Sequence, residues 1–88
     1  PMKEIKLFMM PTCPHCKKAL EMMETLFKAH PEYKDITLRQ IDETKESAYA
    51  EQFDYHYVPT FYVGDEKLHE GVPTEEAVEN VFKRAYAG

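Results

Sequence analysis

The sequence has no tryptophan, only three glycines and only two cysteines among its 88 residues. Two cysteines cannot form the set of disulfide bridges that stabilises many small secreted domains. Both lie in the segment Thr12-Cys13-Pro14-His15-Cys16, and a disulfide across so short a loop would remove little entropy from the unfolded chain. A purely structural role is therefore the weakest explanation of the pair, and a metal site and a redox site remain.

The sequence also lacks a long apolar run. The longest one, Leu7–Met10, is too short to cross a bilayer or to form the core of a signal peptide. Positive charge is in deficit as well, because 16 acidic and 11 basic side chains give a formal charge of -5. Phosphate backbones would be repelled on average. We therefore expect a cytoplasmic protein whose partners include neither nucleic acid nor a membrane.

The composition, with 43% hydrophobic and 31% charged residues, is that of a globular chain, and the length suits one domain over residues 1–88. Alternating apolar residues predict a first strand over Lys3–Met9, with Ile5, Leu7 and Met9 on its buried face. Apolar residues at helical spacing predict a helix that begins at Pro14 and ends near Pro31.

The rest of the chain predicts three further strands, two of them in a hairpin, and two helices. A second strand is expected at Ile36–Ile41, followed by a short helix that is capped within Asp42–Thr44 and extends to Phe53. The hairpin joins Thr60–Val63 to Lys67–His69, and Thr74 caps a last helix that runs to Gly88. The order β-α-β-α-β-β-α predicts an α/β fold: a four-stranded mixed sheet flanked by three helices.

This placement gives the cysteines different roles. Cys13 lies at or next to the N-cap of the first helix, where free backbone N–H groups and the helix dipole favour an anion, so we expect it to be the nucleophile. Pro14, His15 and Lys17 are expected to tune its ionisation toward the thiolate. Cys16 lies one helical turn deeper, should be less exposed, and is placed to resolve a mixed disulfide at Cys13.

The metal alternative finds little support in the sequence. A structural zinc site usually has four ligands, and a second C-x-x-C pair is absent. The four histidines do not show the H-x₃₋₅-H spacing of zinc sites either. We therefore expect no metal ligands in this chain.

The strand, C-P-H-C and helix unit, together with Val58-Pro59-Thr60-Phe61 at the start of the hairpin, resembles the thioredoxin superfamily over nearly the whole chain, and the length resembles its glutaredoxin-sized members. The resemblance implies the thioredoxin fold, a cis peptide bond at Pro59, and pairing of Val58 with an extended substrate. Tyr57, Thr12 and Gly71 are the other substrate-binding residues that we expect.

The same resemblance implies a thiol-disulfide oxidoreductase that uses a dithiol mechanism. Its partners would be disulfide-containing proteins, with a thioredoxin reductase or glutathione as the electron donor. The only redox group would be the Cys13-Cys16 disulfide, with no bound cofactor, and we expect a monomer. Tyr55 and Tyr57 precede Pro59, and they either form an apolar docking surface for partners or pack on the domain itself.

The branch of the superfamily is less clear from the residues. Glutaredoxins typically carry C-P-Y-C, a lysine three residues before the first cysteine and a G-G-x-D stretch; here Met10 and Glu70 stand in the latter two places, and both oppose glutathione. Thioredoxins carry W-C-G-P-C, a buried aspartate and a lysine. Here Leu7 or a neighbour stands near the place of the aspartate, and Leu38 aligns with the lysine.

The dipeptide Pro14-His15 is found in periplasmic disulfide oxidases, in which histidine stabilises the reduced thiolate. We therefore expect a reduction potential between about -270 mV, as in thioredoxin, and about -120 mV, as in that oxidase. Three alternatives stay open: a glutathione-dependent glutaredoxin, a carrier of a metal or iron–sulfur cluster through Cys13, and a binding module whose cysteine pair is idle.

Overall fold

The computed structural model describes residues 1–88. Its four strands form a mixed sheet in the order β2-β1-β3-β4, in which β1 is parallel to β2 and antiparallel to β3, and β3 and β4 form an antiparallel hairpin. This is the four-stranded sheet with three flanking helices that the sequence predicts. The bounds are β1 (Ile5–Met9), α1 (Pro14–Ala29), the 3₁₀ helix η1 (Pro31–Asp35), β2 (Leu38–Asp42), α2 (Ser47–Ala50), β3 (Thr60–Val63), β4 (Glu66–Glu70) and α3 (Glu75–Ala87).

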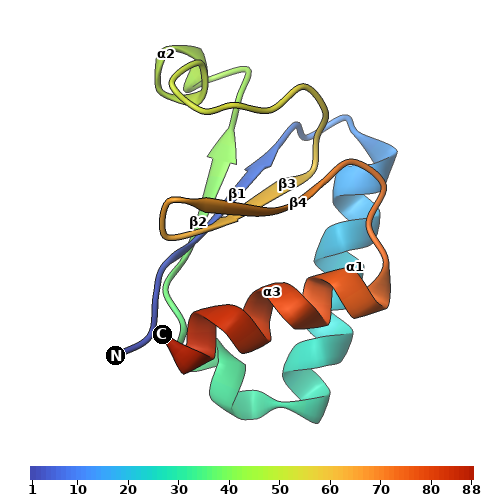
Figure 1. Ribbon diagram of the computed structural model, residues 1–88. Helices are drawn as coiled ribbons and strands as arrows, with labels where there is room; N and C mark the ends of the chain where they lie inside the picture. The colour runs from blue at the N-terminus through green and yellow to red at the C-terminus, as the bar shows by residue number, and fades with distance from the viewer.

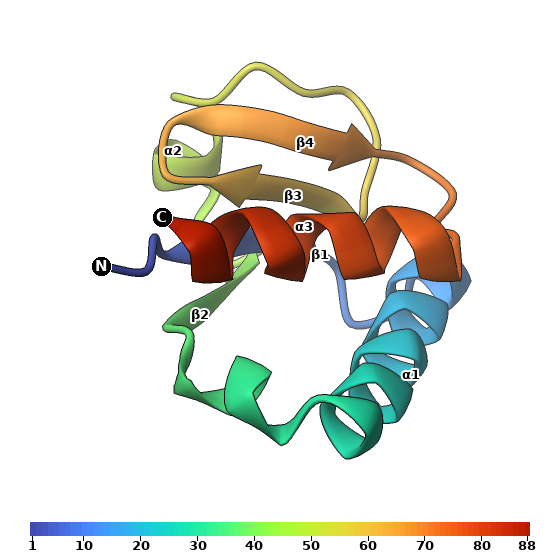
Figure 2. The same ribbon diagram turned by 60° about the horizontal axis from the view of Figure 1, so that its bottom comes forward.

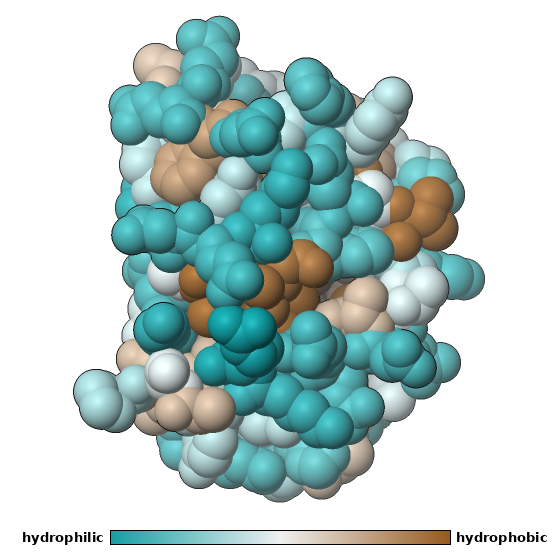
Figure 3. All heavy atoms as spheres, in the orientation of Figure 1, coloured by the Kyte–Doolittle hydropathy of each residue, from teal (hydrophilic) through white to brown (hydrophobic).

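The helices form layers on the two faces of the sheet. Figures 1 and 2 show α1 and α3 together on one side and the short α2 apart from them. The main core lies between the sheet and α1 with α3, and its largest buried residues include Phe61 and Phe82. None of the helices combines the length and apolar composition needed to span a membrane. The face in Figure 3 is mostly hydrophilic. One group of apolar atoms lies between the β3-β4 hairpin and α3, and a second, smaller group lies at the right edge of the view.

The first strand is buried on both faces, so the expectation of a single buried face is wrong. Ile5 and Leu7 face the main core as predicted, but Phe8 is also fully buried, on the opposite face. There it forms a second cluster with Ile41, Ala50 and Tyr62. Aromatic rings from three other segments surround Phe8 at centroid distances of 4.8–6.5 Å, namely those of Tyr49, Phe53, Tyr55 and Tyr62.

The second helix is shorter than predicted. The Asp42 carboxylate accepts hydrogen bonds from the N–H and the hydroxyl of Thr44, at 2.9 and 2.6 Å, and so closes a turn where we expected the helix to begin. The N-cap is Glu46, which makes no side-chain capping bond. The helix ends at Ala50, and the following segment carries Phe53 onto Phe8. Packing of aromatic rings here outweighs continuation of the helix.

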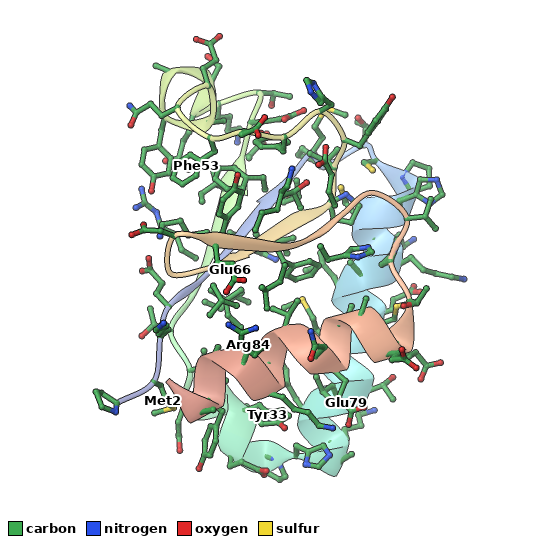
Figure 4. All side chains as sticks on the ribbon, in the orientation of Figure 1. Met2, Tyr33, Phe53, Glu66, Glu79 and Arg84 are labelled. Carbon is green, nitrogen blue, oxygen red and sulfur yellow. The ribbon has the colours of Figure 1, made fainter.

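The bounds of the other helices and strands agree with those predicted from the sequence within a few residues. α1 begins at Pro14 as predicted and is followed by η1, which the sequence reading did not contain. Thr74 caps α3, because its hydroxyl oxygen accepts a hydrogen bond from the Ala77 N–H at 3.1 Å. Figure 4 shows Arg84 of α3 pointing to Glu66 of β4, and the two side chains form an ion pair at 2.8 Å.

The aromatic cluster around Phe8 leads to a stability prediction. Replacing Phe8 with alanine should lower the free energy of unfolding by about 3–5 kcal/mol, because a fully buried ring is removed from a packed core. Urea unfolding followed by circular dichroism measures this. Tyr57→Ala is the matched control, since that ring is 70% exposed and its loss should change the free energy by less than about 0.5 kcal/mol. Equal effects of the two changes would contradict the packing described here.

Candidate active site

The cysteine pair lies where three segments of the chain meet. Cys13 follows β1 and opens α1, the segment 54–59 leads into β3, and β4 ends beside it at Glu70. Figure 1 shows the start of α1 close to the beginning of β3 and to the segment that joins β4 to α3. Cys13 contacts Val58, which lies 45 positions further along the chain. The fold therefore brings these two distant segments together at one end of the sheet, beyond the carboxyl end of β1.

Cys13 is the N-cap residue of α1, as the sequence predicts. Its sulfur accepts a hydrogen bond from the backbone N–H of Cys16 at 3.3 Å. The first turn of α1 carries no acidic side chain, so no carboxylate competes for the unpaired N–H groups at this end of the helix. This arrangement favours negative charge on the Cys13 sulfur.

Cys16 occupies a contrasting environment one turn along the helix. Only 2% of its surface is exposed, whereas Cys13 is half-buried, and both are free thiols. Burial, followed by the interaction with Cys13, raises the pKa of the Cys16 thiol from 9.0 to about 12. Cys16 therefore stays protonated near neutral pH, and only Cys13 is both accessible and placed at the helix end.

Val58 lies against the cysteine from the other side of the site. Its carbonyl oxygen is 3.9 Å from the Cys13 sulfur, to which the thiol can donate. The Val58-Pro59 peptide bond is cis, which confirms the prediction made from the resemblance. The N–H of Val58 makes no hydrogen bond within the protein. Val58 thus offers a free donor next to the sulfur.

The segment that precedes Val58 is tied to the end of β4 by the Glu70 carboxylate. This group accepts hydrogen bonds from the backbone N–H of His56 and from that of Tyr57, the latter at 2.9 Å. Its other oxygen pairs with the Lys67 ammonium at 2.7 Å, and Lys67 also donates to the Asp54 carbonyl at 3.1 Å. We call this set of contacts the Glu70 bridge. The Lys67 hydrogen bond first, and then the two N–H groups, lower the pKa of Glu70 from 4.5 to about 2.

The remaining predicted site residues make fewer contacts. Thr12, His15 and Lys17 are exposed, and their side chains form no hydrogen bond or ion pair. Tyr57 is 70% exposed close to Val58. Gly71 donates its N–H to the Pro59 carbonyl at 2.9 Å and has φ +91°, a conformation that favours glycine. The tuning and substrate-binding roles of these residues stay predictions.

We expected the tyrosines before Pro59 either to form a docking surface or to pack on the domain itself, and Tyr55 packs on the domain. Its ring lies on Phe8, with 4.9 Å between the centroids, and its hydroxyl donates to the Glu43 carboxylate at 2.6 Å. The sequence reading did not find this contact or the Lys67–Glu70 pair. The Tyr55 contacts connect segments that only the folded sheet brings together, whereas Lys67 and Glu70 lie three residues apart within β4.

The surface around Cys13 is open. Neither cysteine lines any of the four hollows in the molecular surface. The largest hollow, of about 430 Å³, lies next to α2 and is lined by Glu43 and Tyr55 among others. Small-molecule sites are usually concave, so a half-buried sulfur outside any hollow suits a substrate that docks on the surface. No cluster of three or more potential metal-ligating side chains is present.

Comparison with known proteins agrees with this geometry. Residues 3–83 match the family described as "Thioredoxin domain". The chain therefore belongs to the thioredoxin family. It is 27% identical over 81 residues to a thioredoxin from Methanocaldococcus jannaschii, an alignment that covers 92% of this chain and 93% of that protein. Membership of the thioredoxin family supports a thioredoxin-like redox function for the two neighbouring cysteines.

Solved structures show the same thioredoxin fold. A structure described as a malarial protein matches with a TM-score of 0.71 at 19% identity, covering 97% of this chain and 98% of the other. Thioredoxin O1 from Arabidopsis thaliana in its oxidized state matches with a TM-score of 0.69 at 21% identity, over 97% of this chain and 78% of the other. At these identities the likeness concerns the fold alone.

The Glu70 bridge gives the protein a defined response to acid. Because folding lowers the pKa of Glu70 from 4.5 to about 2, its ionised form stabilises the fold above about pH 4.5, and this contribution is lost as the pH falls through about 2. The urea midpoint of the wild type should therefore exceed that of Glu70→Gln at pH 6, and the difference should shrink between pH 4.5 and 2. A difference that stays constant over this range, or an equal pH dependence in the control Glu66→Gln, would contradict the bridge.

Proposed function

We propose that this protein is a thiol-disulfide oxidoreductase that reduces or exchanges disulfides of other proteins, with Cys13 as the nucleophile and Cys16 as the resolving thiol. The observation that carries the proposal is the asymmetry of the pair. The Cys13 sulfur sits at a helix N-terminus and reaches the surface, whereas Cys16 is buried and its pKa is raised to about 12. Thiolates, not thiols, attack disulfides, so the attack falls to Cys13.

The reaction transfers two electrons from the cysteine pair to the substrate. The Cys13 thiolate attacks one substrate sulfur, a mixed disulfide forms, and the other substrate sulfur leaves as a thiolate that takes up a proton. Cys16 then loses its proton and attacks the Cys13 sulfur. The Cys13-Cys16 disulfide forms as the second substrate thiol leaves and is protonated. One disulfide is reduced to two thiols, and the protein's two thiols become one disulfide.

The Val58 carbonyl contacts Cys13 only before the first step, while Cys13 is a neutral thiol. The neutral Cys13 thiol can donate to this oxygen at 3.9 Å, and the contact is lost once the sulfur is ionised or bonded to substrate. The Val58 N–H has no partner within the protein, so we propose that an extended substrate segment pairs with the backbone here. The exposed Tyr57 ring adds apolar area on the same edge.

A reductant must regenerate the dithiol. We propose a thioredoxin reductase for this role, with glutathione as the alternative donor. The open edge at Cys13 suits a protein donor, since neither cysteine lines a concave hollow of the kind that holds small ligands. A coupled assay that offers either thioredoxin reductase with NADPH, or glutathione with its reductase, assigns the donor.

Serine variants test the roles of the two thiols. With dithiothreitol as the reductant, Cys13→Ser should lower the rate of insulin reduction to the rate with dithiothreitol alone, because the nucleophile is absent. Cys16→Ser should still attack, but it should accumulate a mixed disulfide at Cys13 that mass spectrometry detects after acid quenching. Full activity of Cys13→Ser, or a mixed disulfide at Cys16 in the wild type, would reject the assignment.

A further inference from the structure

Three consecutive backbone N–H groups lie beside the nucleophile, and only one of them is free. Those of His56 and Tyr57 donate to the Glu70 carboxylate, whereas that of Val58 makes no hydrogen bond within the protein. The three residues adjoin Pro59, and the Val58 carbonyl is 3.9 Å from the Cys13 sulfur. A group that binds the N–H groups of His56 and Tyr57 is therefore bound one or two residues before Val58, the residue that contacts the reacting sulfur.

Two adjacent N–H groups and a nearby ammonium form a typical environment for an anion. Here the anion is the Glu70 side chain of the protein itself. One of its oxygens accepts hydrogen bonds from the two N–H groups, and the other accepts one from the Lys67 ammonium at 2.7 Å. The carboxylate is supplied by the last residue of β4, so it is held by the sheet and needs no external ligand. An incoming carboxylate would find these donors occupied and would meet a like charge.

We propose that Glu70 determines substrate class at this site: by occupying the His56 and Tyr57 N–H groups it rejects small anionic disulfides and leaves only the Val58 backbone for an extended segment. The inference rests on the proposed oxidoreductase function and names the substrates that this function excludes. Small disulfides that carry carboxylates next to the reacting sulfur are disfavoured. Protein segments, which bind by backbone pairing and carry no required anion, are accepted.

Three small disulfides of similar skeleton and different charge test the inference. They are 3,3′-dithiodipropionate, which is a dianion, bis(2-hydroxyethyl) disulfide, which is neutral, and cystamine, which is a dication. Reduced protein is mixed with each, and its loss of free thiols is followed by acid quenching, alkylation and mass spectrometry. The readout is the rate constant for the dianion, or for the dication, divided by that for the neutral compound.

Glu70→Ala should raise the dianion-to-neutral ratio by about three- to tenfold and lower the dication-to-neutral ratio, because two N–H donors and Lys67 become available to an anion. Glu66→Ala is the matched control. It removes the same charge from the other end of β4, where Glu66 pairs with Arg84, and it should leave all three rates unchanged. An unchanged dianion ratio in Glu70→Ala, or an equal rise in Glu66→Ala, overturns the inference.

Glu70→Gln is the second variant, because alanine at this position also releases the segment 54–57. The amide oxygen keeps one acceptor for the N–H groups but removes the charge, so the dianion ratio should rise by about two- to fourfold. A folded Glu70→Gln protein with the wild-type ratio overturns the inference even where Glu70→Ala fails to fold. Direct evidence comes from amide NMR with inorganic phosphate, which should shift the His56 and Tyr57 signals in Glu70→Ala and leave them in place in the wild type.

The neutral disulfide separates failure of this inference from failure of the proposed function. Wild-type protein that is not oxidised by bis(2-hydroxyethyl) disulfide through Cys13 would reject the oxidoreductase itself. Wild-type protein that is oxidised, with ratios that do not depend on Glu70, would reject only the role of Glu70.

Discussion

The hydrogen bond from the Cys16 N–H to the Cys13 sulfur is the contact on which the rest of the site depends. At 3.3 Å it makes Cys13 the N-cap of α1, so the sulfur takes the place that a serine or aspartate oxygen has in other helices. The same contact fixes the spacing of the pair, because the donor belongs to the second cysteine. One backbone interaction thus holds the sulfur of one cysteine at the helix N-terminus and places the other cysteine one turn along the helix.

Two sets of contacts position the two halves of the site, the one that contains Cys13 and the one that contains Val58. The cysteine half follows β1, which is buried on both faces because Phe8 packs among aromatic rings on the side away from α1 and α3. The Val58 half is held by the Glu70 bridge, which crosses from β4 to the segment 54–57. The two sets of contacts meet in the segment 53–57, because Tyr55 packs on Phe8 while its neighbours His56 and Tyr57 donate to Glu70.

Local signals in the sequence predicted the strands, α1, α3 and the position of Cys13, because alternation, helical spacing and capping residues act over a few neighbours. The cis bond at Pro59 came from the resemblance to a known family. The helix α2 was predicted, but its length was overestimated because Asp42 bonds Thr44 and because Phe53 packs on Phe8. The Glu70 bridge was missed for the same kind of reason: Glu70 is 14 residues from His56, and only the completed hairpin brings them together.

We propose that a thiolate held at the start of α1, next to His15, stabilises the reduced form of the pair. The most direct test is a redox titration of the purified protein against glutathione, with the thiol content measured by alkylation and mass spectrometry. We expect a single two-electron transition that involves both Cys13 and Cys16, at a potential between about -270 and about -120 mV. A potential at or below about -270 mV would contradict it, because the reduced form would then be no better stabilised than in an ordinary thioredoxin.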